Sequence, residues 1–334
     1  MRIFVHEFIT GGGLIDAPLS PSLVREGGLM ADALLRDLRD LPNVDVLTTR
    51  DPRLPAPLAG IETHVPHDAR EAALLFARCI DASDAAWIIA PETGGVLARL
   101  SAQVLARNGF LLGSRPDTIR LCTSKARTAE WLARHGIPVA PVFRPDGPTA
   151  SFPGAAVLKP DDGAGCMDTR VHRDRDAALA AWEAAGRPAN VVLQPFVAGE
   201  AASLSLLARG GDAAILSVNR QCVVRCGESL KFLGCSVNGL ASWQGALAPL
   251  ARRIAEALPG LWGYAGVDFI LTADGPVVLE VNPRLTTSYA GLRQAIAQNA
   301  AALVLALLDD PAPLPAAPAA RRAVELTTEL ERVP

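Results

Sequence analysis

The 334-residue sequence predicts an α/β domain followed by an α+β region, because two patterns succeed one another along the chain. Through the first third, apolar runs alternate with helical-period stretches, which is typical of βα units on a parallel sheet. From residue 155 onward, short strands dominate and helices are isolated, which is typical of an α+β region. We therefore expect a small doubly wound domain over residues 1–114, further parts over 115–195 and 196–310, and a Pro/Ala-rich tail over 311–334.

The opening domain is expected to contain strands at residues 3–8, 44–48, 85–90 and 110–113, each a short apolar run. Helical periodicity predicts helices over residues 22–41, 69–80 and 94–107. The string ETHVPHD, which carries His64 and His67, is flanked by proline and is predicted to be a loop. Two consecutive helices over residues 115–136 follow, and the second is expected to stop at Gly136 because Pro138 lies just beyond.

In the second region the predicted strands are AAVLKP, TRVH, VVLQPFV, AASLSLLA, AAILSVNRQ, VDFIL and PVVLEV. Helices are expected over residues 175–185, 244–257 and 287–308. The turn Ala273-Asp274-Gly275 joins the last two strands into a hairpin. The stretch 310–320 is rich in proline and alanine and is predicted to be a linker or frayed tail.

Composition excludes several classes of protein. With 32 Lys and Arg against 35 Asp and Glu, the chain has no basic field for nucleic acid. The longest apolar run, residues 300–308, is too short to span a membrane, and MRIFVHEFIT reads as a strand and not as a signal peptide. The six cysteines lack CxxC spacing and indicate reduced thiols in the cytoplasm.

A lysine followed by a glycine-rich turn is the first chemical signal. Lys159 ends an apolar strand, and the turn Asp162-Gly163-Ala164-Gly165 comes directly after it. Backbone N–H groups of such a turn can bind phosphates while the lysine supplies a point charge. The pattern indicates a phosphate site, although strand ends also carry Lys and Gly for turn reasons.

The predicted hairpin carries the second signal. Asp268 lies on its first strand, and Glu280 and Asn282 lie two residues apart on its second, so that they share one face. Two carboxylates and an amide oxygen suit Mg²⁺, which takes few protein ligands together with phosphates. A polar face of an exposed hairpin explains poorly why all three point one way among Val, Leu, Phe and Ile.

A third signal is the apolar strand that kinks at Pro195 and ends in Gly199-Glu200. Apolar side chains such as Phe196, together with free backbone groups, can sandwich a base there. Glu200 is then placed to reach ribose hydroxyls.

The order and spacing of these motifs resemble the ATP-grasp superfamily of carboxylate–amine ligases, over about residues 119–308. The resemblance implies an ATP-grasp fold, ATP as nucleotide, and two Mg²⁺ ions, with Mn²⁺ as an alternative. It implies phosphate contacts for Lys125, Lys159 and, more loosely, Lys231; a mobile loop over Asp162, Gly163 and Gly165; adenine binding by Gln194, Phe196 and Val197; ribose binding by Glu200; metal binding by Asp268, Glu280 and Asn282; and stabilisation of the transferred phosphate by Arg284. Gln194 replaces the more usual Glu of the family.

Strings such as EFITGGG, APETGGVL and EVNPRLTTSYAGLR look like the tyramine–glutamate ligase family of methanofuran and methylofuran biosynthesis. This resemblance implies small-molecule substrates, glutamate and tyramine or tyrosine, joined through an acyl phosphate with release of ADP. Glu7, Glu26 and Glu92, together with the turn Gly11-Gly12-Gly13, are candidates to line a substrate-amine site at the domain junction. A ligase for other amino acid or purine-pathway substrates and a non-catalytic nucleotide-binding protein stay open as alternatives, as does a homodimer.

Overall fold

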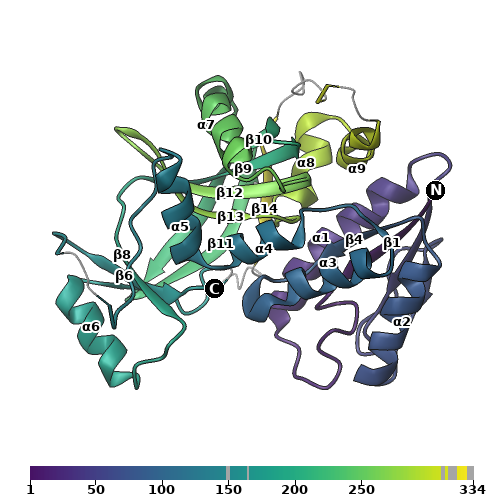
Figure 1. The fold of residues 1–334 in the computed structure, drawn as a ribbon, viewed down its shortest axis with the longest axis horizontal. Helices are drawn as coiled ribbons and strands as arrows, with labels where there is room; N and C mark the ends of the chain where they lie inside the picture. Colours follow the sequence, from purple (N-terminus) through teal and green to yellow (C-terminus); the bar gives the residue numbers. More distant parts are fainter. Residues whose placement is uncertain (148–150, 164, 310–312, 315–321, 329–334) are drawn as a thin grey trace, which may run out of the picture.

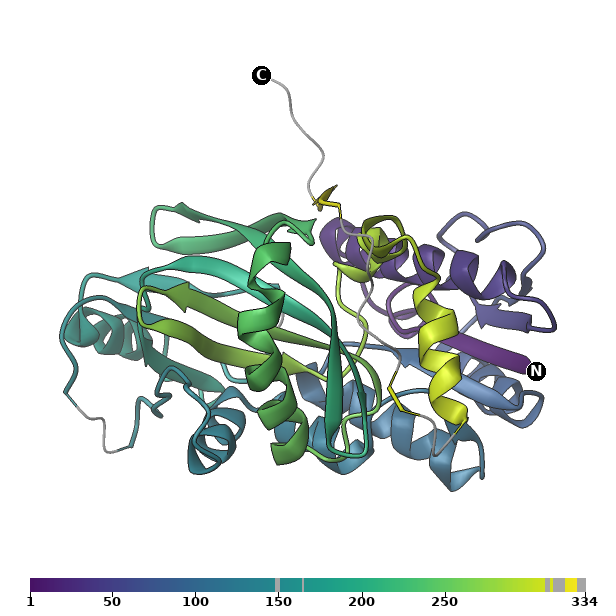
Figure 2. The same cartoon turned by 90° about the horizontal axis from the view of Figure 1, so that it is seen from above.

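The computed structural model describes residues 1–147, 151–163, 165–309, 313–314 and 322–328. Two β-sheets with their own helices lie next to each other (Figure 1). The opening domain forms one end of the molecule and the larger, strongly curved sheet forms the other, as the view from above also shows (Figure 2). The predicted combination of an α/β domain with an α+β region is confirmed.

The opening domain is doubly wound. Its parallel sheet has the order β3-β2-β1-β4-β5. The elements are β1 (Arg2–Glu7), α1 (Pro21–Arg39), β2 (Asp45–Thr49), β3 (Glu62–His64), α2 (Ala69–Asp81), β4 (Ala85–Ile89), the 3₁₀ turn η1 (Thr93–Gly95), α3 (Val96–Ala106) and β5 (Phe110–Leu111). The strand order reverses between β1 and β4, and ligand sites of such sheets lie at the carboxyl ends of the strands at this point. Glu7 ends β1 and Glu92 follows β4, so both lie at that edge.

The predicted loop ETHVPHD is partly wrong, because its first residues form β3 beside β2. The strand is only three residues long, and Thr63 is its one β-branched residue, so the apolar run that marks a strand is absent. Pairing with the edge of β2 supplies the order that the local sequence lacks.

The second sheet has nine strands in the order β13-β12-β9-β10-β11-β7-β6-β8, with β14 beside β11, and its paired strands are antiparallel. Two helices, α4 (Pro116–Thr123) and α5 (Lys125–Arg134), precede it. Its elements are β6 (Ala156–Pro160), β7 (Arg170–His172), α6 (Arg175–Ala184), β8 (Val191–Pro195), β9 (Glu200–Arg209), β10 (Asp212–Cys226), β11 (Ser229–Val237), the 3₁₀ turn η2 (Ala241–Trp243), α7 (Gln244–Ala257), β12 (Gly263–Thr272), β13 (Gly275–Asn282), α8 (Tyr289–Ile296), α9 (Ala300–Leu305), the 3₁₀ turn η3 (Ala306–Leu308) and β14 (Val324–Thr327). The hairpin of β12 and β13 is as predicted.

Two strands of this sheet were not predicted. In β11, Lys231 and Gly234 interrupt the apolar run, and both residues weaken a strand pattern. Strand β14 lies within the predicted tail and pairs with β11 through residues 324–327. Of the predicted linker over residues 310–320, the structure describes only residues 313–314.

The single helix predicted over residues 287–308 is wrong. Ala297 adopts a left-handed conformation with φ of 54°, and the side chain of Asn299 caps α9 by accepting a hydrogen bond from the Ala302 N–H. Among the described residues, no single helix has the length and apolarity that crossing a membrane requires. Helices over 289–296 and 300–308 reach them only as a pair bent by 95°.

The two sheets share a hydrophobic core, because α1 packs against α8 and α9 as well as on its own sheet. Figure 2 shows α8 and α9 next to the opening domain. One cluster contains Ile3 and Leu34 of the opening domain together with Tyr264 and Leu292 of the second region. The orientation of the opening domain is thereby fixed against the sheet that carries the predicted ligand residues.

We predict that Gly234→Ala loosens β14 from β11. Gly234 has φ of +141°, and an added Cβ would collide with the Leu326 carbonyl oxygen. The collision and the backbone strain together are expected to cost about 1–3 kcal/mol and to lower the melting temperature. Gly227→Ala is the control, since Gly227 also has positive φ (+65°) but open space around it. Equal melting temperatures for the two variants would contradict the assigned pairing.

Candidate functional site

Two adjoining cavities lie along one face of the second sheet, and their lining residues overlap. We name the first the hinge cavity, because the turn after β8 closes it; Lys125, Lys159, Gln194, Phe196 and Val197 are among its lining residues. We name the second the junction cavity, because α1 of the opening domain closes it; Glu26, Asn282, Arg284 and Phe232 are among its lining residues. The residues common to both are Gly165, Cys166, Gln221, Asp268 and Glu280.

Two carboxylates stand directly opposite each other in this shared wall. Asp268 of β12 is the register partner of Glu280 of β13, next to a bulge that follows Asp268. The Asp268 carboxylate accepts hydrogen bonds from Gln221 Nε2 (2.8 Å) and Asn282 Nδ2 (3.2 Å). Burial and the neighbouring Glu280 raise the pKa of Asp268 well above its usual range. The three residues predicted to bind metal therefore lie together in a place of concentrated negative charge.

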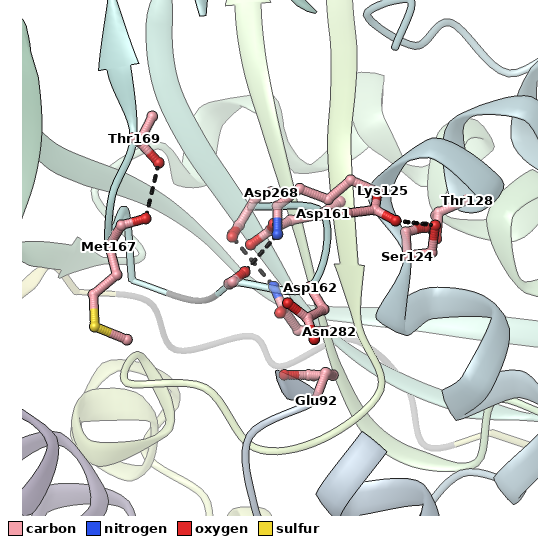
Figure 3. A network of polar contacts seen from close by, with 12 residues as sticks. Glu92, Ser124, Lys125, Thr128, Asp161, Asp162, Met167, Thr169, Asp268 and Asn282 are labelled. Atoms are coloured by element: carbon pink, nitrogen blue, oxygen red, sulfur yellow. Dashed lines mark hydrogen bonds and ion pairs between the residues drawn. The ribbon is translucent and has the colours of Figure 1, made fainter. Parts of the chain in front are cut away.

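Two lysines face these carboxylates. Lys125 Nζ lies 3.2 Å from Glu280 Oε2 and also donates to the Gly163 carbonyl oxygen. Burial would raise the pKa of Glu280, but Lys125 and Lys159 outweigh it and lower the pKa to about 2. Burial, and then the charge of Lys125, lower the pKa of Lys159 to about 8. Figure 3 shows Lys125 extending from α5 toward Asp268 and Asn282.

Asp161, which the sequence analysis did not single out, holds Lys125 in place. Its buried carboxylate accepts hydrogen bonds from Ser124 Oγ (2.7 Å), Ala126 N–H (2.9 Å) and Arg144 Nη2 (2.6 Å). Its carbonyl oxygen accepts from the Lys125 N–H (3.0 Å). Asp161 therefore ties the first turn of α5 to the end of β6, and the only sequence signal was its place after the strand lysine.

The glycine-rich turn contacts the opening domain. Asp162 accepts hydrogen bonds from Thr93 Oγ1 (2.8 Å, to the carbonyl), the Gly94 N–H (2.9 Å) and Asn190 Nδ2 (2.5 Å). Gly165 has φ of +62° and lines both cavities, whereas residue 164 of the predicted loop lies outside the described residues. The η1 turn thus anchors one end of the loop, and no sequence pattern announced the contact.

The predicted adenine-binding residues surround the outer end of the hinge cavity. Gln194 is buried in β8, and its Nε2 donates to the Ala140 carbonyl oxygen (3.3 Å). Phe196 follows β8 with 43% of its surface exposed, and Val197 lines the cavity beside it. An apolar slot with backbone groups at its rim suits a planar heterocycle.

Two predicted residues are not brought to either cavity. Glu200 begins β9, and its carboxylate accepts a hydrogen bond from Arg220 Nε (2.5 Å) at the exposed surface. Lys231 lies exposed on β11, opposite Val224 of β10. Neither residue is part of the lining of the two cavities, so the structure gives their predicted ribose and phosphate contacts no geometric support.

Arg284 lines the junction cavity and is paired with the opening domain. Its Nε and Nη2 donate to Glu92 Oε2 at 3.0 and 2.8 Å. Both side chains are nearly buried, at 11% and 8% exposure, and Glu92 Oε1 has no hydrogen-bond partner among the described residues. The ion pair joins residues 192 positions apart and connects the segment between β4 and η1 of the opening domain to the loop after β13.

Comparisons with known proteins point to one family. A family model described as an ATP-grasp domain matches residues 122–288, and one described as a pre ATP-grasp 3 domain matches residues 44–119. The tyramine–L-glutamate ligase of Methanocaldococcus jannaschii is 36% identical over 104 residues, which is 31% of this chain and 32% of that protein. The matched segment thus spans about a third of that relative's length.

Solved structures show the same fold over nearly the whole chain. A putative ATP-grasp superfamily protein from Archaeoglobus fulgidus aligns with a TM-score of 0.73 and 22% identity, covering 97% of this chain and 91% of the other. The L-amino acid ligase of Bacillus licheniformis aligns with a TM-score of 0.63 and 18% identity, covering 91% and 73% of the two chains.

We predict that Asp161→Ala destabilises the site region. The substitution leaves the Ser124 hydroxyl, the Ala126 N–H and the Arg144 guanidinium without their shared carboxylate acceptor. Hydrogen bonds to a charged group each contribute about 1.5–3 kcal/mol, so the melting temperature should fall by several degrees. Asp146→Ala, which removes an exposed carboxylate, is the control. An Asp161→Ala variant as stable as that control would show that Asp161 does not organise α5.

Proposed function

The chain belongs to the ATP-grasp family, and on this premise we propose that it is an ATP-dependent ligase joining a carboxylic acid to an amine. One observation carries the proposal: two cavities, one lined by two lysines and the other by an arginine, meet at the opposed carboxylates Asp268 and Glu280. Nucleotide in the hinge cavity and acid with amine in the junction cavity then place the reacting atoms at the shared wall.

The residues fit a magnesium nucleotide. Asp268 and Glu280 face each other across one strand pair, and burial together with the neighbouring charge of Glu280 raises the pKa of Asp268. Divalent cations held by carboxylate and amide oxygens would balance them, with Asn282 as the third donor. When bound, such ions neutralise the phosphates and polarise the phosphorus that is attacked.

The chain's own groups then have separate tasks. Lys125 and Lys159 hold the phosphate chain by charge, and Gln194, Phe196 and Val197 hold the base. Gly163 and Gly165 line the cavities at the shared wall and help to exclude water, which would otherwise hydrolyse an acyl phosphate. Arg284 stabilises the charge that develops as the amine displaces phosphate.

No covalent enzyme intermediate is needed in this scheme. Cys166 and Cys235 line the junction cavity, but burial raises the pKa of each thiol to about 12. Both therefore stay protonated near neutral pH and are poor nucleophiles. All six cysteines are free thiols, which supports our proposal of a reducing, cytoplasmic location.

For the substrates we propose glutamate and an aromatic amine, tyramine or tyrosine. The matching relatives from two Methanocaldococcus species are tyramine–L-glutamate ligases, which supports this choice. Apolar Phe232 and Met30 in the junction cavity offer contact area for a phenol ring. A role in methylofuran-type cofactor synthesis and a homodimer stay predictions from the sequence.

The first test is ADP release. We expect ADP and phosphate to form only when ATP, an acid and an amine are all present, with tyramine or tyrosine preferred about tenfold or more over alanine and ammonium. Glu280→Gln, which is close to isosteric, should lower the rate at least about 100-fold. The assay follows ADP, with mass spectrometry of the product in a competition among the amines.

Each alternative has its own outcome in this assay. Preference for alanine or ammonium would point to a ligase of other substrates. Stoichiometric AMP would overturn an acyl-phosphate route. Nucleotide binding with no turnover on any acid and amine would point to a non-catalytic binding protein.

A second prediction concerns pH. The pKa of Lys159 in the free protein is about 8, and a bound triphosphate favours its protonated form. Nucleotide affinity should therefore fall as pH rises through 8, by about tenfold between pH 7 and 9. The arginine of a Lys159→Arg variant stays charged over this range, so the variant should bind the nucleotide equally well at pH 7 and pH 9. Calorimetry with a non-hydrolysable ATP analogue checks this, and a wild type without pH dependence would contradict it.

A further inference from the structure

The opening domain contributes three carboxylates near the junction cavity, and two of them are already engaged. Glu7 is buried, and its carboxylate accepts hydrogen bonds from the Thr10 N–H (2.6 Å), Thr10 Oγ1 (2.7 Å) and the Ile9 N–H (3.2 Å). Glu92 is paired with Arg284. Neither of these carboxylates is free to bind a cationic ligand without first breaking its own contacts.

Glu26 differs from both. It lies in the second turn of α1 and lines the junction cavity, and within the described part of the chain its carboxylate makes no hydrogen bond or ion pair. Arg284 is the cationic residue of the cavity lining, and its guanidinium is bonded to Glu92. The charge of Arg284 acts on Glu26 without a hydrogen bond, because the guanidinium is bonded to Glu92. A half-buried carboxylate without a hydrogen-bonded counter-ion is unfavourable, and a cationic group entering the cavity would remove that cost.

The position of Glu26 is fixed by its surroundings. An added Cβ on the next residue, Gly27, would lie 2.6 Å from Glu7 Oε2, so α1 runs tightly against the end of β1. On the other side, a Cβ on Gly165 would lie 3.8 Å from both carboxylate oxygens of Glu26. The backbone that carries Glu26 is therefore packed against the end of β1, and its carboxylate lies next to Gly165 of the glycine-rich loop.

The opposite wall of the cavity is also ordered. Thr286 and Ser288 line it, and Tyr264 OH lies within hydrogen-bond distance of both hydroxyls, at 2.9 and 3.1 Å. Tyr264 OH also donates to Ser205 Oγ (2.9 Å), so the loop after β13 is tied to the sheet. A ligand that enters this cavity thus finds a preformed site, with the carboxylate of Glu26 on one side and the shared wall of Asp268 and Glu280 on the other.

We propose that Glu26 binds the primary ammonium group of a substrate in the junction cavity. The inference rests on the proposed function and adds a chemical class to it: at least one substrate carries a primary ammonium that forms a charged hydrogen bond with this carboxylate. Two sources have that chemistry, the α-ammonium of an amino acid whose carboxylate is activated and the protonated form of the attacking amine. The experiment separates them.

The variant is Glu26→Gln, which keeps the shape of the side chain and removes its charge. Asp32→Asn, on the same helix but outside both cavities, is the matched control. ADP release is measured with glutamate and with glutarate, which lacks the ammonium group, at varied tyramine. We expect KM for the substrate that bears the bound ammonium to rise about tenfold or more in Glu26→Gln, with KM for ATP unchanged.

The two sources predict different patterns. If Glu26 binds the ammonium group of the acid, the wild type should prefer glutamate over glutarate. Glu26→Gln should then abolish this preference and leave KM for tyramine unchanged. If Glu26 binds the protonated attacking amine, Glu26→Gln should raise KM for tyramine with either acid. Values of both KM within twofold of the Asp32→Asn control would overturn the proposal. Glu26→Asp keeps the charge on a shorter stem, and it should fall between the wild type and Glu26→Gln.

Failure of the proposed function gives a separate result. If the wild type releases no ADP, calorimetric titration of glutamate and of tyramine into the wild type and Glu26→Gln decides the inference alone. An affinity for either ligand that is about tenfold lower in Glu26→Gln than in the wild type supports the inference. Binding that the variant leaves unchanged, or no binding of either ligand to the wild type, overturns it. Equal melting temperatures of the variants show that the fold is intact.

Discussion

The site depends on two carboxylates that face each other across one strand pair. Like charges directly opposite in an antiparallel ladder are destabilising, and burial increases the effect. Here Asp268 and Glu280 are kept together by Lys125, which pairs with Glu280, by Lys159, and by amide donors on Asp268. The arrangement favours ligand binding. Its clustered carboxylates can bind cations, and its two buried lysines can bind an anion.

This balance requires the lysines to be placed accurately, and much of the surrounding structure serves that purpose. Asp161 fixes the start of α5, from which Lys125 extends, and the Gly163 carbonyl oxygen holds its ammonium group. The opening domain takes part as well, because η1 bonds to Asp162 and Glu92 bonds to Arg284. Because it shares a core with α8 and α9, the opening domain is part of the site's framework.

The elements that could be predicted are those with a strong local period. The helix over residues 244–257 has the expected bounds, and the hairpin around Asp274 has the expected turn. Both could be predicted because amphipathic spacing and turn chemistry act over a few residues. Strands β3, β11 and β14 were missed because pairing with a neighbouring strand, and not their own sequence, makes them extended. The break at Ala297 escaped notice because alanine rarely adopts positive φ.

For the site, the sequence alone determined that Asp268, Glu280 and Asn282 share a face and that Lys159 ends a strand beside a glycine-rich turn. Strand alternation and turn composition are local properties, so these groupings are fixed before tertiary contacts form. Only the tertiary structure decided that Glu200 pairs with Arg220 at the surface, that Glu92 pairs with Arg284, and that Glu26 lines a cavity without a hydrogen bond or ion pair to any described residue. Partners of that kind are chosen by how α1, η1 and the large sheet pack together, and packing between segments almost 200 residues apart leaves no periodic trace in the chain.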